Sequence, residues 1–567
     1  MPSYGSTRRN GVDAAKGPPT STSVFAVPNS SSSSASTPLL QSIDDADGSS
    51  PHDDHHETVP DEHSPERRLG IAGTVFLILN KMIGTGIFST PASVFAATGS
   101  VGLSILLWIA GGVIIMAGLS TYLEFGLAIP RSGGEKNYLE RVYRRPPLLA
   151  TCMLASQMVL LGFSAGNALA FGRYVLYAVS DGGSMGATDG WLARVIGVVL
   201  VIVVIGLHSV APRWGIRLFN TLGVFKVGVL AFIVVTGFAA LAGYRRVPDP
   251  HNFDRPFDMS DLGRYGGGGA YAYASALLSI IYSFKGWENA NYVLSEVRNP
   301  RRTLMVAGPL AVGLCTVLYV LATVAYFAAI PADDLAASDV IVAGLFFRNV
   351  FGDGAAARVL PIFVAVSNLG NVLAVSFAHA RFNQELAREG ILPFSRLLAS
   401  SRPFNSPAAS LILHGIITII ILVAPPPGPA YNFIINLYVY PGTVVNIFVT
   451  GGLLYLHYNR KKEGWLSPWH TPWPVAILFL LSNVFLMMVP FWPPAPGWDP
   501  EGYPYYIFPV VGVGVLVLGA VYWLVWTQIG PWLGSYRLEP EHVRGDDGIT
   551  VVRYKRVKKD DAEEVEQ

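Results

Sequence analysis

The chain has 567 residues, of which 51% are hydrophobic and only 14% are charged, with a mean hydropathy of +0.41 and a formal net charge of +1. A soluble domain carries about 25% charged residues, so this composition excludes an ordinary soluble protein and indicates a polytopic membrane protein. The net charge gives no support for a nucleic-acid partner. The two cysteines, Cys152 and Cys315, lie in apolar runs and exclude a disulfide scaffold or a zinc cluster.

The chain begins with a polar segment, residues 1–66, which is rich in Ser, Pro, Gly, Asp and His and contains the run SSSSAS. Such a segment cannot bury enough apolar surface to offset its loss of conformational entropy. We therefore expect a disordered cytosolic tail and no signal peptide. A second, charged cytosolic tail is expected at 529–567, so that residues 67–528 form the membrane domain.

Twelve apolar stretches in this domain have about the 20 residues that a helix needs to cross a bilayer. Arg and Lys residues gather in the loops on one side and are sparse in the loops after the third, ninth and eleventh stretches. This asymmetry predicts that both termini lie in the cytosol. The predicted spans are 69–97, 101–128, 149–179, 191–209, 218–242, 270–296, 303–330, 358–388, 406–425, 431–457, 471–490 and 505–528.

Two of these spans are interrupted near their middle. The first holds Gly84-Thr85-Gly86, and the sixth holds Gly286 within the polar stretch YSFKGWENAN, 282–291. Glycine costs about 1 kcal/mol relative to alanine in a helix interior. Close helix packing explains a single glycine motif well, but two interruptions at matched positions favour a pair of broken helices around a transporter site.

A broken helix has a definite chemistry. The break frees N–H groups at the start of its second half and C=O groups at the end of its first half. The N–H groups and the helix dipole suit a carboxylate, and the C=O groups suit an ammonium. One broken span therefore matches both charged ends of an α-amino acid.

Four motifs carry a family resemblance: IGTGIFSTP (83–91), YLEFGLAIPRSGGEKNYLERVY (122–143), YSFKGWENANYVLSEVRNPRRTL (282–304) and AREGILP (387–393). The chain resembles the amino acid/polyamine/organocation transporters, in particular the L-type amino acid transporter branch. Its first-helix motif and Ser-rich tail are most similar to the fungal high-affinity methionine permease subgroup. The loop at 180–190, which holds a cysteine in vertebrate L-type relatives, has none here, so no disulfide-linked heavy chain is expected.

The resemblance implies an all-α, twelve-helix, LeuT-like fold. Helices 1 and 6 are broken in a five-plus-five inverted repeat, with one repeat at about 69–242, the second at about 270–457 and peripheral helices at 471–528. It implies that the substrate carboxylate meets the N–H groups of Thr85, Gly86 and Ile87 and the Thr85 hydroxyl. The substrate ammonium would meet the carbonyls of Met82, Ile83, Tyr282, Ser283 and Lys285, with Tyr282 as the aromatic gate.

Polar residues inside the spans add further expectations. Lys226 lies within the fifth span, where a lysine costs roughly 2.5–3.5 kcal/mol and is functional by default. The resemblance implies that it replaces a sodium ion, either as a fixed cation or as a group that exchanges a proton. Ser367, Asn368 and Asn371 form a polar stripe expected near this lysine. Weaker pocket expectations are Gln157, Ser164 and Asn167 in the third span and Asn436, Tyr438 and Tyr440 in the tenth. Lys285 is expected to pair with Glu288 or to reach the substrate.

Glu124 and Glu296 end the second and sixth spans near cytosolic arginines. They are interpreted as an inner gate or loop-anchoring set, and plain structural ion pairs are the alternative. His208, His379 and His414 are interpreted as structural.

These features favour a sodium-independent secondary transporter of neutral amino acids, including methionine, with proton-coupled uptake favoured over exchange. An amino-acid exchanger and an amino-acid sensor remain alternatives. No nucleophile elbow, metal set or phosphate-binding loop is present in the sequence, so neither an enzyme nor a cofactor is expected. The expected setting is the plasma membrane, with the tails open to a ubiquitin ligase or kinase.

Overall fold

The structure is a computed structural model. It describes residues 70–130, 133–180, 190–259, 268–292, 297, 299–402, 404–425, 430–494, 504–544 and 550–558. All of these residues belong to one compact unit, Pro60–Gln567. The predicted N-terminal tail and Glu296 lie outside the described residues.

Helices make up most of the described chain, because a backbone surrounded by lipid must satisfy its hydrogen bonds within its own segment. The helices are α1 (Ile71–Met82), α2 (Thr85–Thr98), α3 (Val101–Ala128), α4 (Glu135–Val142), α5 (Leu149–Leu160), α6 (Ala165–Val179), α7 (Trp191–Val210), α8 (Pro212–Leu241), α9 (Gly269–Phe284), α10 (Asn289–Tyr292), α11 (Pro300–Ala329), α12 (Ala332–Ala337), α13 (Val342–Phe351), α14 (Ala355–Arg388), α15 (Ser395–Leu398), α16 (Ala408–Val423), α17 (Ala430–Tyr458), α18 (Arg460–Glu463), α19 (Trp473–Met488), η3 (Val489–Phe491), α20 (Ile507–Leu524), η4 (Val525–Ile529) and α21 (Gly530–Gly534). The strands are β1 (Tyr536–Arg544) and β2 (Thr550–Lys558).

The described residues include nine helical stretches long and apolar enough to cross a membrane, and α1 with α2 makes a tenth that is bent by 49°. These ten match ten of the predicted spans. The other two predicted spans, 270–296 and 406–425, correspond to α9 and α16, each with 16 residues. A helix of 16 residues is about 24 Å long, which is shorter than the bilayer core of about 30 Å. A membrane protein of many spans is confirmed, whereas the count of twelve stays a prediction.

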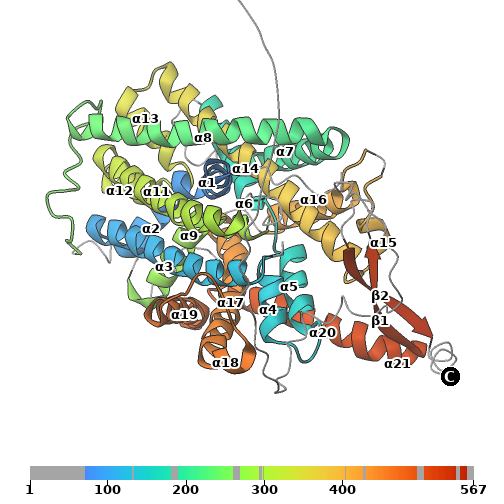
Figure 1. The fold of residues 1–567 in the computed structure, drawn as a ribbon. Helices are drawn as coiled ribbons and strands as arrows, with labels where there is room; N and C mark the ends of the chain where they lie inside the picture. The colour runs from blue at the N-terminus through green and yellow to red at the C-terminus, as the bar shows by residue number, and fades with distance from the viewer. Residues whose placement is uncertain are drawn as a thin grey trace, which may run out of the picture. The chain divides into compact units, whose positions relative to one another are not determined.

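The two halves of the first span lie at the centre of the helix bundle. Figure 1 shows the long helices α3, α8 and α11 running roughly side by side, with α1 among them. Helix α1 packs on α11 and α8, α2 packs on α9, and α14 packs on α6 and α8. Both broken helices are therefore enclosed by other helices, which is where unwound backbone is tolerated at membrane depth.

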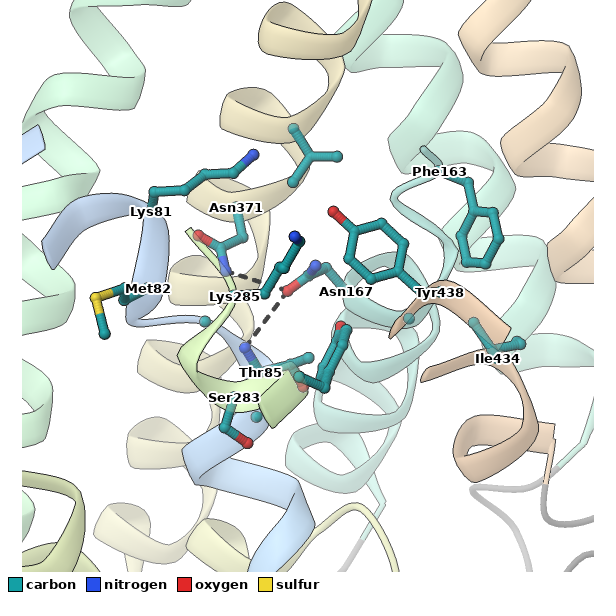
Figure 2. Close-up of a pocket in the computed structure, with 15 residues that line it drawn as sticks. Lys81, Met82, Thr85, Phe163, Asn167, Ser283, Lys285, Asn371, Ile434 and Tyr438 are labelled. Atoms are coloured by element: carbon teal, nitrogen blue, oxygen red, sulfur yellow. Dashed lines mark hydrogen bonds between the residues drawn. The ribbon is translucent and has the colours of Figure 1, made fainter. Parts of the chain in front are cut away.

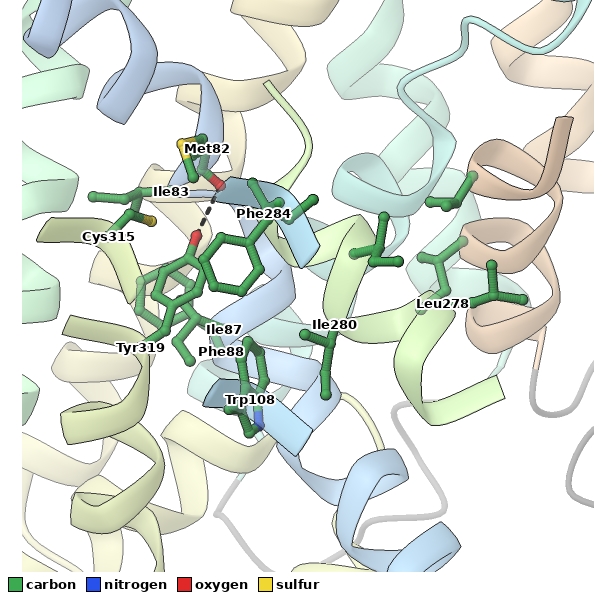
Figure 3. Close-up of a cluster of buried hydrophobic side chains, with 14 of the residues drawn as sticks. Met82, Ile83, Ile87, Phe88, Trp108, Leu278, Ile280, Phe284, Cys315 and Tyr319 are labelled. Atoms are coloured by element: carbon green, nitrogen blue, oxygen red, sulfur yellow. Dashed lines mark hydrogen bonds between the residues drawn. The ribbon is translucent and has the colours of Figure 1, made fainter. Parts of the chain in front are cut away.

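An aromatic cluster fills the space beside the breaks (Figure 3). The Tyr319 ring on α11 meets the Trp108 ring of α3 edge-on, with 5.6 Å between the ring centroids. The centroid of the Phe284 ring of α9 lies 5.0 Å from that of Tyr319. All three side chains are fully buried. Aromatic pairs of this kind contribute about 0.5–1.5 kcal/mol beyond their burial, so the cluster holds three helices together next to the site.

Ion pairs fix α4, which belongs to the predicted cytosolic side. Lys136 Nζ lies 2.5 Å from Glu389 Oε1, just past the end of α14. The Glu463 carboxylate of α18 accepts hydrogen bonds from Arg141 at 3.3 Å and Arg144 at 3.1 Å. Helix α4 is thereby tied to two elements that are distant in the sequence.

The predicted C-terminal tail contains a structure that the sequence analysis did not expect. Strands β1 and β2 form an antiparallel hairpin in which Tyr536 pairs with Lys558 and Arg544 with Thr550. The Tyr554 N–H donates to the Glu389 carbonyl at 3.2 Å, and the Tyr554 ring meets the Trp526 ring edge-on at 6.1 Å. The hairpin is therefore packed against the helical body.

Candidate functional site

The first break is present where the sequence predicted it. Helix α1 ends at Met82 and α2 begins at Thr85, with Ile83 and Gly84 in extended conformations between them. The first turn of any helix leaves N–H groups without intrahelical partners, which here belong to Thr85, Gly86 and Ile87. The break therefore presents N–H donors at the start of α2 and carbonyls at the end of α1, whereas binding of a zwitterion there stays a prediction.

Both glycines of this break are needed for close approach. A Cβ atom on Gly84 would lie 1.9 Å from Asn371 Nδ2, and a Cβ atom on Gly86 would lie 2.5 Å from Ser283 Cα. Either contact is shorter than van der Waals packing allows. Both explanations considered for the glycines, a helix break and close helix packing, are therefore correct.

The second break follows α9, which ends at Phe284. Residues 285–288 form a turn before the short α10, and Gly286 has φ +122°, a conformation that favours glycine. A Cβ atom on Gly286 would lie 2.3 Å from Lys81 Cγ, so the second break packs directly on the end of α1.

Tyr319 joins the two breaks. Its hydroxyl oxygen lies 2.9 Å from the Met82 carbonyl oxygen and 2.9 Å from the Ser283 carbonyl oxygen, and Figure 3 shows the first of these bonds. These are two of the carbonyls that the family resemblance implied for the substrate ammonium. Tyr319 was not predicted from the sequence, because nothing local distinguishes it from other tyrosines in an apolar span.

A cavity opens between the breaks (Figure 2). The empty space at its lining atoms, with the open solvent at its mouth included, is about 470 Å³. Six of the predicted contact residues line it, whereas Ile83 and Ile87 have side chains buried in the neighbouring core, although Ile87 still begins α2 with its N–H. The lining residues are Lys81, Met82, Gly84, Thr85, Gly86, Phe163, Gly166, Asn167, Tyr282, Ser283, Lys285, Asn371, Val375, Ile434 and Tyr438.

The cavity wall includes the predicted aromatic gate and two of the six weaker pocket expectations, Asn167 and Tyr438. The Tyr282 ring meets the Tyr438 ring edge-on at 5.9 Å, and a Cβ atom on Gly166 would lie 2.9 Å from the Tyr282 hydroxyl. The Thr85 hydroxyl already lies near Ser89 Oγ at 3.2 Å and accepts from the Tyr431 hydroxyl at 3.3 Å. The Thr85 side chain is thus partly satisfied within the protein.

Lys226 connects to the first break through two asparagines. Its Nζ donates to Asn371 Oδ1 at 2.6 Å, Asn371 Nδ2 donates to Asn167 Oδ1 at 3.3 Å, and the Thr85 N–H donates to the same Asn167 oxygen at 3.4 Å. Lys226 is fully buried, and Figure 2 shows the last two links. This series of hydrogen bonds connects four helices, α8, α14, α6 and α2.

Ser367, Asn368 and Asn371 were predicted near this lysine, and its hydrogen bond goes to Asn371, about one helical turn along α14 from the other two. Both residues are fully buried, and within the described part of the chain Ser367 Oγ and both polar side-chain atoms of Asn368 have no hydrogen-bond partner. The polar stripe of α14 therefore faces the interior, with Asn371 as its contact to Lys226.

Lys285 pairs with Glu288, as their spacing suggested. The distance from Lys285 Nζ to Glu288 Oε1 is 2.6 Å, and Glu288 Oε2 accepts from the Gly286 N–H at 3.1 Å. The buried carboxylate thus stabilises both the lysine and the turn of the second break.

Glu124 contacts the segment that leads into α19. Its carboxylate accepts from Thr471 N at 2.7 Å and from Trp465 Nε1 at 3.0 Å, and it lies 2.7 Å from His457 Nε2. These contacts fit the loop-anchor interpretation of Glu124. The gate interpretation of Glu124 stays a prediction, and so does that of Glu296.

The fold and this site define the class. A small cavity at two helix breaks, inside a bundle of membrane-length apolar helices, is the arrangement of a multi-pass membrane transport protein. The family model for amino acid permeases matches residues 69–516. The chain belongs to the amino acid permease family.

Individual relatives agree with the family. The high-affinity methionine permease of Saccharomyces cerevisiae is 39% identical over 532 residues, covering 93% of this chain and 91% of the relative. The low-affinity methionine permease of the same yeast is 31% identical over 492 residues, covering 86% and 87%. The b(0,+)-type amino acid transporter 1 of Rattus norvegicus is 28% identical over 447 residues, covering 78% and 86%. The family and these relatives are permeases and transporters, not enzymes.

Proposed function

We propose that this chain is a sodium-independent secondary transporter that takes up neutral amino acids, with methionine and related sulfur amino acids as its preferred substrates. The observation that carries the proposal is the cavity between two broken helices, which offers N–H donors and carbonyl acceptors to one small zwitterion. The methionine preference rests on the likeness to the yeast methionine permeases.

The backbone recognises the charged ends of the substrate. The N–H groups of Thr85, Gly86 and Ile87 hold the carboxylate at the positive end of the α2 dipole. The carbonyls of Met82, Ile83, Tyr282, Ser283 and Lys285 hold the ammonium. A carbonyl oxygen has two lone pairs, so Met82 and Ser283 can accept from the Tyr319 hydroxyl and from the substrate at once.

Lys226 supplies the coupling. Its ammonium stands where a sodium ion would otherwise bind, and the Asn371–Asn167 chain connects it to the Thr85 N–H at the carboxylate position. Loss of a proton from Lys226 weakens the hydrogen bond that Asn371 Oδ1 accepts from it. The side-chain amides of Asn371 and Asn167 can then reorient. This supports proton-coupled uptake over exchange.

Transport follows alternating access in a LeuT-like arrangement. A bundle of α1, α2, α3, α9, α10 and α11 rocks against the other helices, and Tyr282 covers the substrate during the change. The protein works in the plasma membrane with both tails in the cytosol, where ubiquitin ligases and kinases reach them.

Uptake of radiolabelled amino acids into permease-deficient cells tests the proposal, at pH 5 and pH 7.5 and with or without sodium. We expect uptake of methionine that is faster at acidic pH and unchanged by sodium. Dependence on a preloaded internal amino acid would make the chain an exchanger. Binding without flux would make it a sensor, and no uptake of any neutral amino acid despite normal surface expression would refute the proposal.

A further inference from the structure

The charge of the cavity wall is unbalanced. Among the residues that line the cavity, Lys81 and Lys285 carry ammonium groups and no residue carries a carboxylate. Lys285 is paired with Glu288 behind the wall at 2.6 Å. Across the described ranges of the chain, Lys81 makes no hydrogen bond or ion pair, and the Glu288 carboxylate that attracts its charge is already paired with Lys285.

The backbone directs Lys81 toward the cavity. Lys81 lies in the last turn of α1, one residue before Met82, and its stem packs against Gly286, where a Cβ atom would lie 2.3 Å from Lys81 Cγ. Figure 2 shows the side chain extending across the cavity on the side of Asn371. The carbonyls at the end of α1 form the negative end of its dipole, which favours a cation there.

We propose that Lys81 is a specificity-determining residue of this site, whose ammonium faces the substrate side chain. It rejects amino acids with cationic side chains and favours uncharged side chains that offer an acceptor, such as a thioether or an amide. The inference rests on the proposed function, because it concerns which amino acids enter the same cavity.

Only the substrate side chain can distinguish one amino acid from another at this site. Every α-amino acid brings the same carboxylate and ammonium to the breaks, so their interactions cancel when two amino acids are compared. A cationic side chain adds a like charge beside Lys81 with no carboxylate in the wall to offset it. One such contact at a poorly hydrated site changes a binding constant by about tenfold or more.

A purely structural role for Lys81 would have different consequences. A lysine at a helix C-terminus also stabilises the helix through the dipole, and its replacement would then lower stability without altering selectivity. The ratio of two competitors separates the two roles, because a loss of folded protein affects both competitors equally.

The test is competition against uptake of labelled methionine by norleucine and ornithine, which have side chains of equal length and differ in charge. We expect the wild type to favour norleucine strongly over ornithine. Lys81→Met should reduce that preference about tenfold or more, whereas Lys81→Arg, which keeps the charge, should retain it. Lys462→Met is the matched control, because Lys462 is exposed on α18 and the same substitution there should leave the ratio unchanged.

Glutamine provides the second arm, because its amide offers an acceptor that norleucine lacks. In Lys81→Met, glutamine should compete less well relative to norleucine than in the wild type. If Lys81→Met is not expressed at the surface, the same ratios are measured with Lys81→Gln and by thermal stabilisation of the purified protein.

Unchanged ratios in Lys81→Met, or equal shifts in Lys81→Met and Lys81→Arg, would overturn the inference and leave the proposed function standing. Absence of amino-acid uptake by the wild type would overturn both.

Discussion

Replacement of Gly86 by alanine should widen the contact between the two broken helices. The new Cβ atom would lie 2.5 Å from Ser283 Cα and 2.3 Å from Ser283 Oγ. Ordinary contact begins at 3.4 Å, so α2 and α9 must separate by about 0.9 Å (3.4 minus 2.5) at this point. The atom that must move is backbone, which cannot turn aside as the end of a flexible side chain can.

The energy follows from three effects. Overpacking costs roughly 1–3 kcal/mol. The same separation would stretch the contact between Thr90 Oγ1 and Ser283 Oγ, now 3.0 Å, beyond hydrogen-bonding distance and lose about 0.5–1.5 kcal/mol. Alanine favours the helical conformation by about 1 kcal/mol relative to glycine, which offsets part of this loss. We therefore expect a net loss of about 1–3 kcal/mol of stability, and a larger effect on uptake, because the N–H groups that hold the carboxylate move with α2.

The assays are the melting temperature of the detergent-solubilised protein and methionine uptake normalised to surface expression. Gly206→Ala is the control, since Gly206 lies in α7 and a Cβ atom there meets nothing within 4 Å. Uptake by Gly86→Ala should fall at least about tenfold while Gly206→Ala behaves as the wild type. Wild-type uptake by Gly86→Ala would refute the assignment of this contact to the binding site.

Three further predictions concern other parts of the structure. Tyr319→Phe should remove the hydroxyl that links the two breaks, lowering stability by about 1 kcal/mol and reducing uptake; full uptake at wild-type stability would show that this link is unimportant. Lys226→Ala should abolish uptake or remove its pH dependence, and an unchanged pH profile at a normal rate would contradict a coupling role. Burial alone would raise the pKa of the Glu463 carboxyl, but the hydrogen bond from Arg141 and the charge of Arg144 outweigh it and lower the pKa below the usual 4.5. A lowered folded-state pKa contributes stability that is present above the unfolded value and is lost as the pH falls through the folded one. The melting temperature of Glu463→Gln should therefore be lower than that of the wild type at pH 7, and the two should approach each other below about pH 4. A difference that persists in acid would rule out this ion pair as its cause.

The sequence was most informative where one residue type has few explanations. The glycines and polar residues at 84–86 and 286 predicted both breaks, because such residues weaken a helix wherever they occur. Long apolar runs predicted the membrane helices for the same local reason. Among the described residues, nine helices of membrane length, or ten with α1 and α2 counted as one span, agree with the predicted spans, whereas α9 and α16 are too short to decide the full count.

Contacts between distant segments could not be predicted in the same way. The two carbonyls near the Tyr319 hydroxyl belong to residues 237 and 36 positions away, and no local pattern marks such a partner. Lys81 was overlooked although it lies within the first predicted span, 69–97, where the reasoning applied to Lys226 would also have marked it. The third span is interrupted between α5 and α6, at 161–164, with only Gly162 as a local signal.

The Tyr319 hydroxyl has a consequence for how the site responds to a ligand. It carries a single hydrogen and faces two carbonyl oxygens at the same distance, 2.9 Å. Two arrangements of equal geometry therefore exist, and in each of them one carbonyl keeps an acceptor position that the hydroxyl has not filled. An arriving ammonium can select either arrangement by a rotation of one O–H bond. The empty site thus has two hydroxyl orientations of equal geometry. A bound donor selects one of them without a change in the backbone of either broken helix.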